Sequence, residues 1–178
     1  MVVNDVNKKK SIIQFLVGFT PIFLLWCIGA YTYMSHFDNF NIDPNHSPYY
    51  LVVPVIAVIL IPFFLLIFAI VCKRKSLNHM YIGALLATGL PVLASILSPV
   101  FSDDGNILSW IYAFTIGLVL YPFGRVAFET FQGISGFYFT FTEQKFIEEE
   151  TINFVLVAAI IISAILFKVI KAPKGRVK

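Results

Sequence analysis

Long runs of apolar residues, separated by short polar segments, form the pattern of this chain. The clearest run extends from Leu51 to Cys72 and stops at Lys73, Arg74 and Lys75. About 20 apolar residues in one helix match the roughly 30 Å hydrocarbon core of a bilayer. The predicted spans are residues 11–34, 51–72, 80–101, 107–123 and 152–167, with a weaker segment at 126–142. The pattern therefore predicts an all-α fold, a polytopic transmembrane helical bundle that forms one integral membrane domain over residues 1–178.

Three clusters of positively charged residues lie beside these runs. Lys8–Lys10 precede the first run and Lys73–Lys75 follow the second. The cations after the last run are Lys168, Lys171, Lys174, Arg176 and Lys178. Carboxylates lie at the other ends, with Asp103 and Asp104 after the third run and Glu148–Glu150 before the last. Because Lys and Arg are retained in cytoplasmic segments, we expect both termini to form short basic cytoplasmic tails and the chain to cross the membrane an even number of times.

Residues 126–142 form the ambiguous segment. They are rich in Phe but contain Glu129, Gln132 and two glycines, which weaken them as a span. A cytoplasmic C-terminal tail requires the chain to return to the outer face after Arg125. We therefore expect six crossings, five strong and one weak. Two alternatives stay open, namely a re-entrant hairpin formed with residues 107–123, and five spans with the weak segment in the cytoplasm.

Composition supports membrane insertion. Hydrophobic residues make up 58% of the chain and charged residues 13%, whereas soluble domains are about 45–50% apolar and about 25% charged. The net charge of +3 could suggest nucleic acid as a partner. The cations lie beside apolar runs, however, where they set topology and meet anionic headgroups. We expect the lipid bilayer to surround the chain and no direct contact with nucleic acid.

Two ionisable residues lie close to the predicted membrane interior. Arg125 and Glu129 are four positions apart and can pair on one face of a helix. Intramembrane charges are costly and often functional. Our first expectation is that the pair lies near the inner interface and neutralises itself. The alternative is a polar site in which Glu129, Gln132 and the glycine-containing break at residues 133–136 line a path for an ion.

Small residues recur along the third run at Gly83, Ala87, Ala94 and Ser98. Spacings of four and seven residues place such side chains on one helix face. Small side chains let helix backbones approach closely in lipid. We predict a helix contact face here, and the pattern leaves open whether it packs within the chain or between copies.

Prolines and aromatic residues add detail to the first two runs. Pro54 and Pro62 are eight positions apart and therefore lie on nearly one face of the second run. We expect this face to be bent and to point into the bundle, with a pore lining as the alternative. Trp26, Tyr31 and Tyr33 are expected to anchor the outer end of the first run at the membrane interface.

The chain lacks the motifs of common catalytic and metal sites. His36, Asp38, Asp43 and His46 contain potential zinc ligands, but turn-forming residues surround them and we expect a solvated loop. No His-Glu-x-x-His, Gly-x-Ser-x-Gly, phosphate-binding loop or Cys-x-x-Cys motif occurs. The third histidine, His79, is predicted on the other membrane face. We therefore expect a non-enzymatic protein with no metal and no cofactor.

These features favour a small protein of the bacterial inner membrane that works by assembly. We expect a homo-oligomer that acts as the membrane subunit or sensor of a multi-component system and binds a cytosolic or membrane protein. Bacterial defence or toxin immunity is suggested by size and span count alone, which is an analogy. The predicted partner-facing basic residues are Lys73, Arg74, Lys75, Lys171, Lys174 and Arg176. The alternative is a small ion channel or transporter that uses Glu129 and the Pro54/Pro62 face.

Overall fold

The computed structural model describes residues 2–37, 49–101, 118–142 and 149–170 of the 178. Its helices are α1 (Val2–Phe37), α2 (Tyr49–Lys75), α3 (Asn78–Phe101), α5 (Leu118–Thr142) and α6 (Glu149–Val169). Each described element is a helix, so the predicted all-α class is confirmed for this part of the chain.

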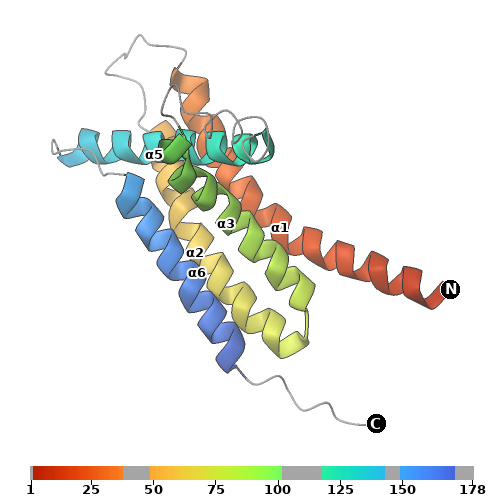
Figure 1. Cartoon of the computed structure of the whole chain (residues 1–178). Coiled ribbons are helices and arrows are strands. Elements are labelled where there is room, and N and C mark those ends of the chain that lie inside the picture. Colours follow the sequence, from red (N-terminus) through yellow and green to blue (C-terminus); the bar gives the residue numbers. More distant parts are fainter. Residues whose placement is uncertain (1, 38–48, 102–117, 143–148, 171–178) are drawn as a thin grey trace.

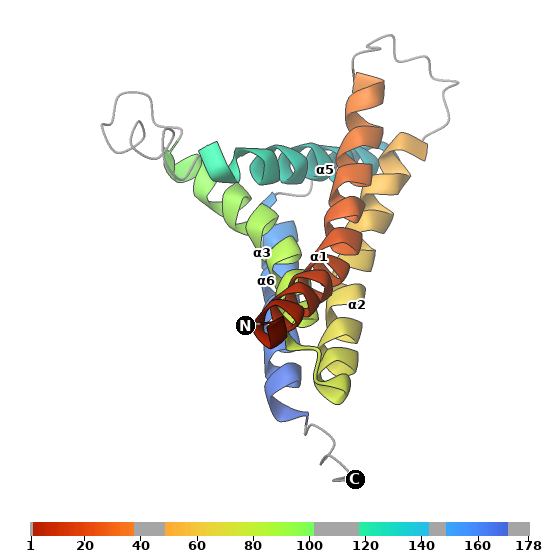
Figure 2. The same ribbon diagram turned by 90° about the vertical axis from the view of Figure 1, so that its right-hand side faces the viewer.

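Among the described residues, four helices are long and apolar enough to cross a membrane, namely α1, α2, α3 and α6. The predicted spans at residues 11–34, 51–72, 80–101 and 152–167 each fall within one of these helices. They form a bundle in which α1 and α6 both pack against α2 and α3. Successive members of the bundle run in opposite directions, and α5 runs across them (Figures 1 and 2). The chain therefore belongs to the class of integral membrane helical bundles.

A tight turn joins α2 to α3. Leu77 donates its backbone N–H to the Cys72 carbonyl at 2.8 Å, and Ser76 donates to the Lys73 carbonyl at 3.4 Å. Ser76 has a φ of 56°, the left-handed conformation that commonly ends a helix in this bonding pattern. The basic last turn of α2 therefore lies directly beside the first turn of α3.

Two glycines allow α1 and α3 to cross closely. A Cβ atom added to Gly18 would lie within van der Waals overlap of the Met80 carbonyl oxygen, and one added to Gly83 would overlap the Phe15 carbonyl oxygen. The predicted contact residues Ala87 and Ala94 are buried in α3 as well. The side chain of Ser98 lies outside the described residues. The structure therefore places the small residues Gly83, Ala87 and Ala94 in packing within the chain.

Aromatic and hydroxyl groups join α6 to the α2–α3 turn. The rings of Tyr81 and Phe167 stack with centroids 4.1 Å apart, and Lys73 Nζ lies 4.8 Å from the Phe167 ring centre. Ser163 donates to the Ile160 carbonyl at 2.8 Å, so the Tyr81 hydroxyl donates to Ser163 Oγ at 3.0 Å. These contacts place the C-terminal end of α6 at the basic end of the bundle.

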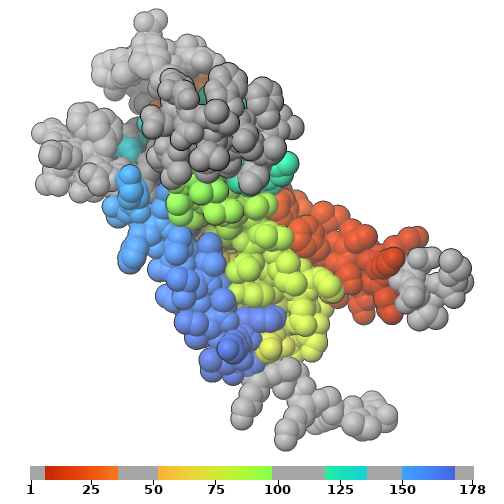
Figure 3. Space-filling view, viewed as in Figure 1, coloured from red at the N-terminus to blue at the C-terminus, as the bar shows by residue number. Residues whose placement is uncertain are grey.

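The outward face of α6, drawn in blue in Figure 3, carries large apolar side chains. Its exposed large side chains are Phe154, Val155, Ile161, Ile162, Ile165 and Val169. In a helix of membrane-spanning length, such a face is suited to lipid. The structure thus pairs a polar and aromatic inner side of α6 with a lipid-facing outer side.

The predicted division between residues 107–123 and 126–142 is wrong. Helix α5 continues through Gly124 and Arg125 without a break. The charge at Arg125 had suggested a membrane boundary, but Arg125 pairs with Glu129 one turn later and is compatible with a continuous helix. Residues 107–117 of the predicted fourth span lie outside the described part of the chain. Within the part of the chain that the structure describes, α5 is not among the helices found long and apolar enough to span a membrane.

Candidate functional site

Helix α5 lies across the end of the bundle opposite the α2–α3 turn (Figures 1 and 2). A Cβ atom added to Gly133 would lie 2.6 Å from Pro54 Cγ, near the start of α2, and one added to Gly124 would lie 3.4 Å from Ala94 Cβ, late in α3. Pro54 and Lys73 are 19 positions apart, which is about 28 Å along a helix. This length is close to the roughly 30 Å thickness of a hydrocarbon core. The basic turn and α5 therefore lie one hydrocarbon thickness apart.

The inner face of α5 rests on Trp26 of α1. The rings of Trp26 and Phe131 meet edge to face with centroids 5.7 Å apart, and both side chains are fully buried. The Thr130 hydroxyl lies 2.8 Å from the Val126 carbonyl and 3.3 Å from the Trp26 carbonyl, so its proton can be donated to either. A Cβ atom added to Gly29 would lie 3.0 Å from Thr130 Cγ2. This close packing fixes α5 against the middle of α1.

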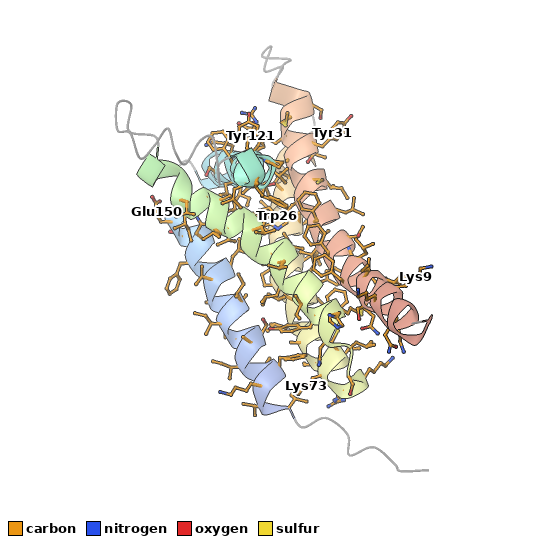
Figure 4. All side chains as sticks on the ribbon, turned by 45° about the vertical axis from the view of Figure 1, so that its right-hand side comes forward. Lys9, Trp26, Tyr31, Lys73, Tyr121 and Glu150 are labelled. Carbon is orange, nitrogen blue, oxygen red and sulfur yellow. The ribbon has the colours of Figure 1, made fainter. Side chains whose placement is uncertain are left out.

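The expected role of Trp26 as an interfacial anchor is wrong. Trp26 lies beneath α5 in the bundle interior (Figure 4), and its indole N–H has no acceptor among the described residues. Tyr31, by contrast, is strongly exposed near the far end of α1. Aromatic anchors and buried aromatic residues have the same apolar rings, so their sequence signal is the same until a packing partner such as Phe131 is known.

An ion pair occupies the middle of α5. Arg125 Nη2 lies 2.5 Å from Glu129 Oε1; the Arg125 side chain is 52% exposed and the Glu129 side chain is 7% exposed. The sequence predicts this pair at the same membrane face as Lys73, whereas α5 lies across the end of the bundle opposite the α2–α3 turn (Figures 1 and 2). A buried carboxylate needs a compensating partner, and Arg125 supplies it from the same helix.

The other residues of the predicted polar site and proline face, Gln132, Pro54 and Pro62, differ in where they lie relative to α5. Gln132 is half-buried on α5 and takes part in interactions of its own. Pro54 is fully buried against α5, whereas Pro62 is half-buried two turns further along α2. The structure therefore brings Pro54 close to α5 at Gly133 and leaves Pro62 nearer the middle of the bundle.

The second candidate site is the basic end of the bundle, which contains Lys8–Lys10, Lys73–Lys75 and Lys168. Of these residues, Lys73 is half-buried and the others are exposed. Lys9 and Lys73 both lie at the end away from Tyr121 of α5 (Figure 4). Lys171, Lys174 and Arg176 belong to the predicted partner-facing set but lie outside the described residues. The cations of α2 and α6 thus lie together at one end of the bundle, and Lys8–Lys10 lie on the N-terminal part of α1, which projects to the side of this end (Figure 1).

Metal binding finds no support in the part of the chain with described positions, where no group of three His, Cys, Asp or Glu side chains is close enough to hold an ion. The considered ligands Asp38, Asp43 and His46, and the side chain of His36, lie outside that part. Comparison of the chain with models of protein families, with curated proteins and with solved structures finds no match.

Proposed function

We propose that this protein is a non-enzymatic subunit of a membrane assembly that binds an acidic surface of a partner protein at its basic end. The carrying observation is the exposure of Arg74, Lys75 and Lys168 at one end of the bundle, with Lys8–Lys10 on the part of α1 that projects to the side of it (Figure 1). Electrostatic complementarity of this kind guides partner encounter and sets orientation. A homo-oligomer within a bacterial defence or toxin-immunity system remains our proposed setting, on the analogy of size.

The proposed topology has the basic end in the cytoplasm of a bacterial inner membrane. Four crossings by α1, α2, α3 and α6 then place both termini in the cytoplasm, as the positive-inside rule requires. Helix α5 lies at the outer interface instead of forming a sixth crossing. The alternating direction of the four apolar helices and the crosswise path of α5 support this arrangement (Figure 1).

Neutralising the exposed cations of the α2–α3 turn tests the proposed partner surface. The double substitution Arg74→Gln/Lys75→Gln should lower recovery of the natural partner in affinity purification about tenfold, because two exposed ion pairs contribute up to about 1 kcal/mol each. Added salt should weaken recovery with the unsubstituted chain, since it screens exposed charges. Lys73 is left in place because it contacts Phe167.

The matched control is Arg74→Lys/Lys75→Arg, which keeps both charges and should keep recovery unchanged. Because these cations also direct insertion, a cysteine placed at the exposed Glu150 reports topology through its reaction with a membrane-impermeant thiol reagent. Equal recovery by the neutralised and control proteins, at equal abundance and with equal topology, would count against the proposal.

A small channel is the second candidate function, and the buried carboxylate of Glu129 is the observation that favours it. Intramembrane carboxylates commonly mark ion pathways. If Glu129 lines such a pathway, Glu129→Gln should reduce cation flux into liposomes at least tenfold, because a neutral amide cannot balance the charge of the cation. Glu150→Gln, which changes an exposed carboxylate on α6, is the control and should leave flux intact. Equal flux in all three proteins excludes this function for Glu129.

A further inference from the structure

Three exposed side chains lie on the side of α5 that faces away from the bundle. Tyr121, Arg125 and Phe128 occupy positions i, i+4 and i+7, which share one face of a helix. Tyr121 is 70% exposed and Phe128 is 44% exposed, while Thr130 and Phe131 are fully buried. Tyr121 lies at the end of the molecule farthest from Lys73 (Figure 4). Helix α5 therefore has one face for the bundle and one for its surroundings.

The depth of α5 indicates what those surroundings are. Pro54, which contacts α5, lies about 28 Å along α2 from Lys73. On α1, the Trp26 carbonyl that faces Thr130 is 16 positions from Lys10, or about 24 Å. With the lysines in one headgroup layer, both lengths place α5 at the opposite edge of a hydrocarbon core of roughly 30 Å. Tyr residues and long basic side chains are favoured at this depth.

The guanidinium of Arg125 is arranged to bind an anion. An arginine has five N–H donors in a planar fork that matches two oxygens of a phosphate. Glu129 accepts from Nη2 at 2.5 Å and is itself buried, so the pair tethers the guanidinium to α5 while half of the Arg125 side chain stays exposed. The tether reduces the conformational freedom that a phosphate contact would otherwise remove.

We propose that Arg125 binds the phosphate of a phospholipid headgroup in the leaflet opposite the basic end. Tyr121 and Phe128 then lie beside the lipid glycerol and upper acyl region, where amphipathic and aromatic side chains are favoured. The bound lipid stabilises α5 through contacts with its outer face, whereas Phe131 stabilises α5 by packing its inner face against Trp26. This site is independent of the protein partner proposed at the basic end.

Solid-state nuclear magnetic resonance can measure this contact directly. The chain contains three arginines, Arg74, Arg125 and Arg176, so Arg74→Lys/Arg176→Lys leaves Arg125 alone while keeping the charge. The full-length variant is labelled with carbon-13 at the arginine Cζ atom and placed in phosphatidylglycerol bilayers in phosphate-free buffer. We expect the Arg125 signal to be dephased by lipid phosphorus-31, because a guanidinium hydrogen-bonded to a phosphate holds the two nuclei in direct proximity.

A second sample separates the lipid from free phosphate. In maltoside micelles with inorganic phosphate and no phospholipid, the dephasing should be lost. A visible Arg125 signal without dephasing in the bilayer would overturn the proposal, and so would equal dephasing in the phosphate-containing micelles. Wild-type thermal stability of the Arg74→Lys/Arg176→Lys variant shows that the measurement reports on the folded chain.

Discussion

Gly83→Val is expected to destabilise the bundle by about 3 kcal/mol, near the upper end for overpacking of a protein interior. A Cβ atom at this position would lie 3.0 Å from the Phe19 backbone nitrogen and would overlap the Phe15 carbonyl oxygen. Backbone atoms of a helix cannot rotate away as a flexible side chain can, so α1 and α3 must separate along their crossing. Unfolding of the purified protein in mixed micelles, titrated with sodium dodecyl sulfate, measures the change in free energy.

The same helix provides a matched control at Gly89. A Cβ atom added there meets nothing within 4 Å, so Gly89→Val introduces the same side chain into α3 without a clash. Valine and glycine differ little in helix propensity compared with the expected clash. We therefore expect Gly89→Val to change stability by less than about 1 kcal/mol. Similar losses in the two variants would show that α3 responds to valine itself and not to the crossing with α1.

The crossing at Gly83 shows what a sequence pattern can predict in a membrane bundle. The four apolar spans follow from hydropathy because each must match the hydrocarbon core by itself. The small-residue face of α3 follows from helical periodicity, and it includes Gly83. Its partner Gly18 has no Gly, Ala or Ser three or four positions away on either side and so gives no periodic signal. The contact between the two helices therefore required the structure.

Helix α5 could not be placed from sequence for a different reason. Its hydropathy is intermediate because one face packs on the bundle and the other carries Tyr121 and Arg125. The residues that position it are distant in sequence, since Thr130 and Trp26 are 104 positions apart. A charge beside an apolar run ordinarily indicates a membrane boundary, but in α5 Glu129 neutralises Arg125 within the same helix. The four-residue spacing was enough to predict the ion pair between Arg125 and Glu129. It was not enough to predict at which end of the bundle the pair lies.

The second large effect on stability is expected for Phe131→Ala, which removes the side chain that packs α5 against Trp26. Phe131 is fully buried and meets the edge of Trp26, so truncation leaves a cavity that the packed helices can fill only in part. Loss of a buried phenylalanine side chain typically costs about 3–5 kcal/mol. Because α1 and α3 remain joined at Gly18 and Gly83, we expect α5 to open locally before the bundle unfolds.

Phe128→Ala is the control that separates the loss of packing against Trp26 from the change in helix propensity that any Phe→Ala substitution causes. Phe128 lies one turn away on the same helix and is 44% exposed, so the same atoms are removed with a loss of about 0.5 kcal/mol or less. Hydrogen–deuterium exchange is measured in detergent micelles without phospholipid, so that no bound lipid contacts Phe128. It should accelerate across α5 in Phe131→Ala and stay near the wild-type rate in Phe128→Ala. Helix propensity changes equally in both variants, so the difference between them measures tertiary contact alone. Equal exchange in the two proteins would mean that α5 is held by something other than its packing on Trp26.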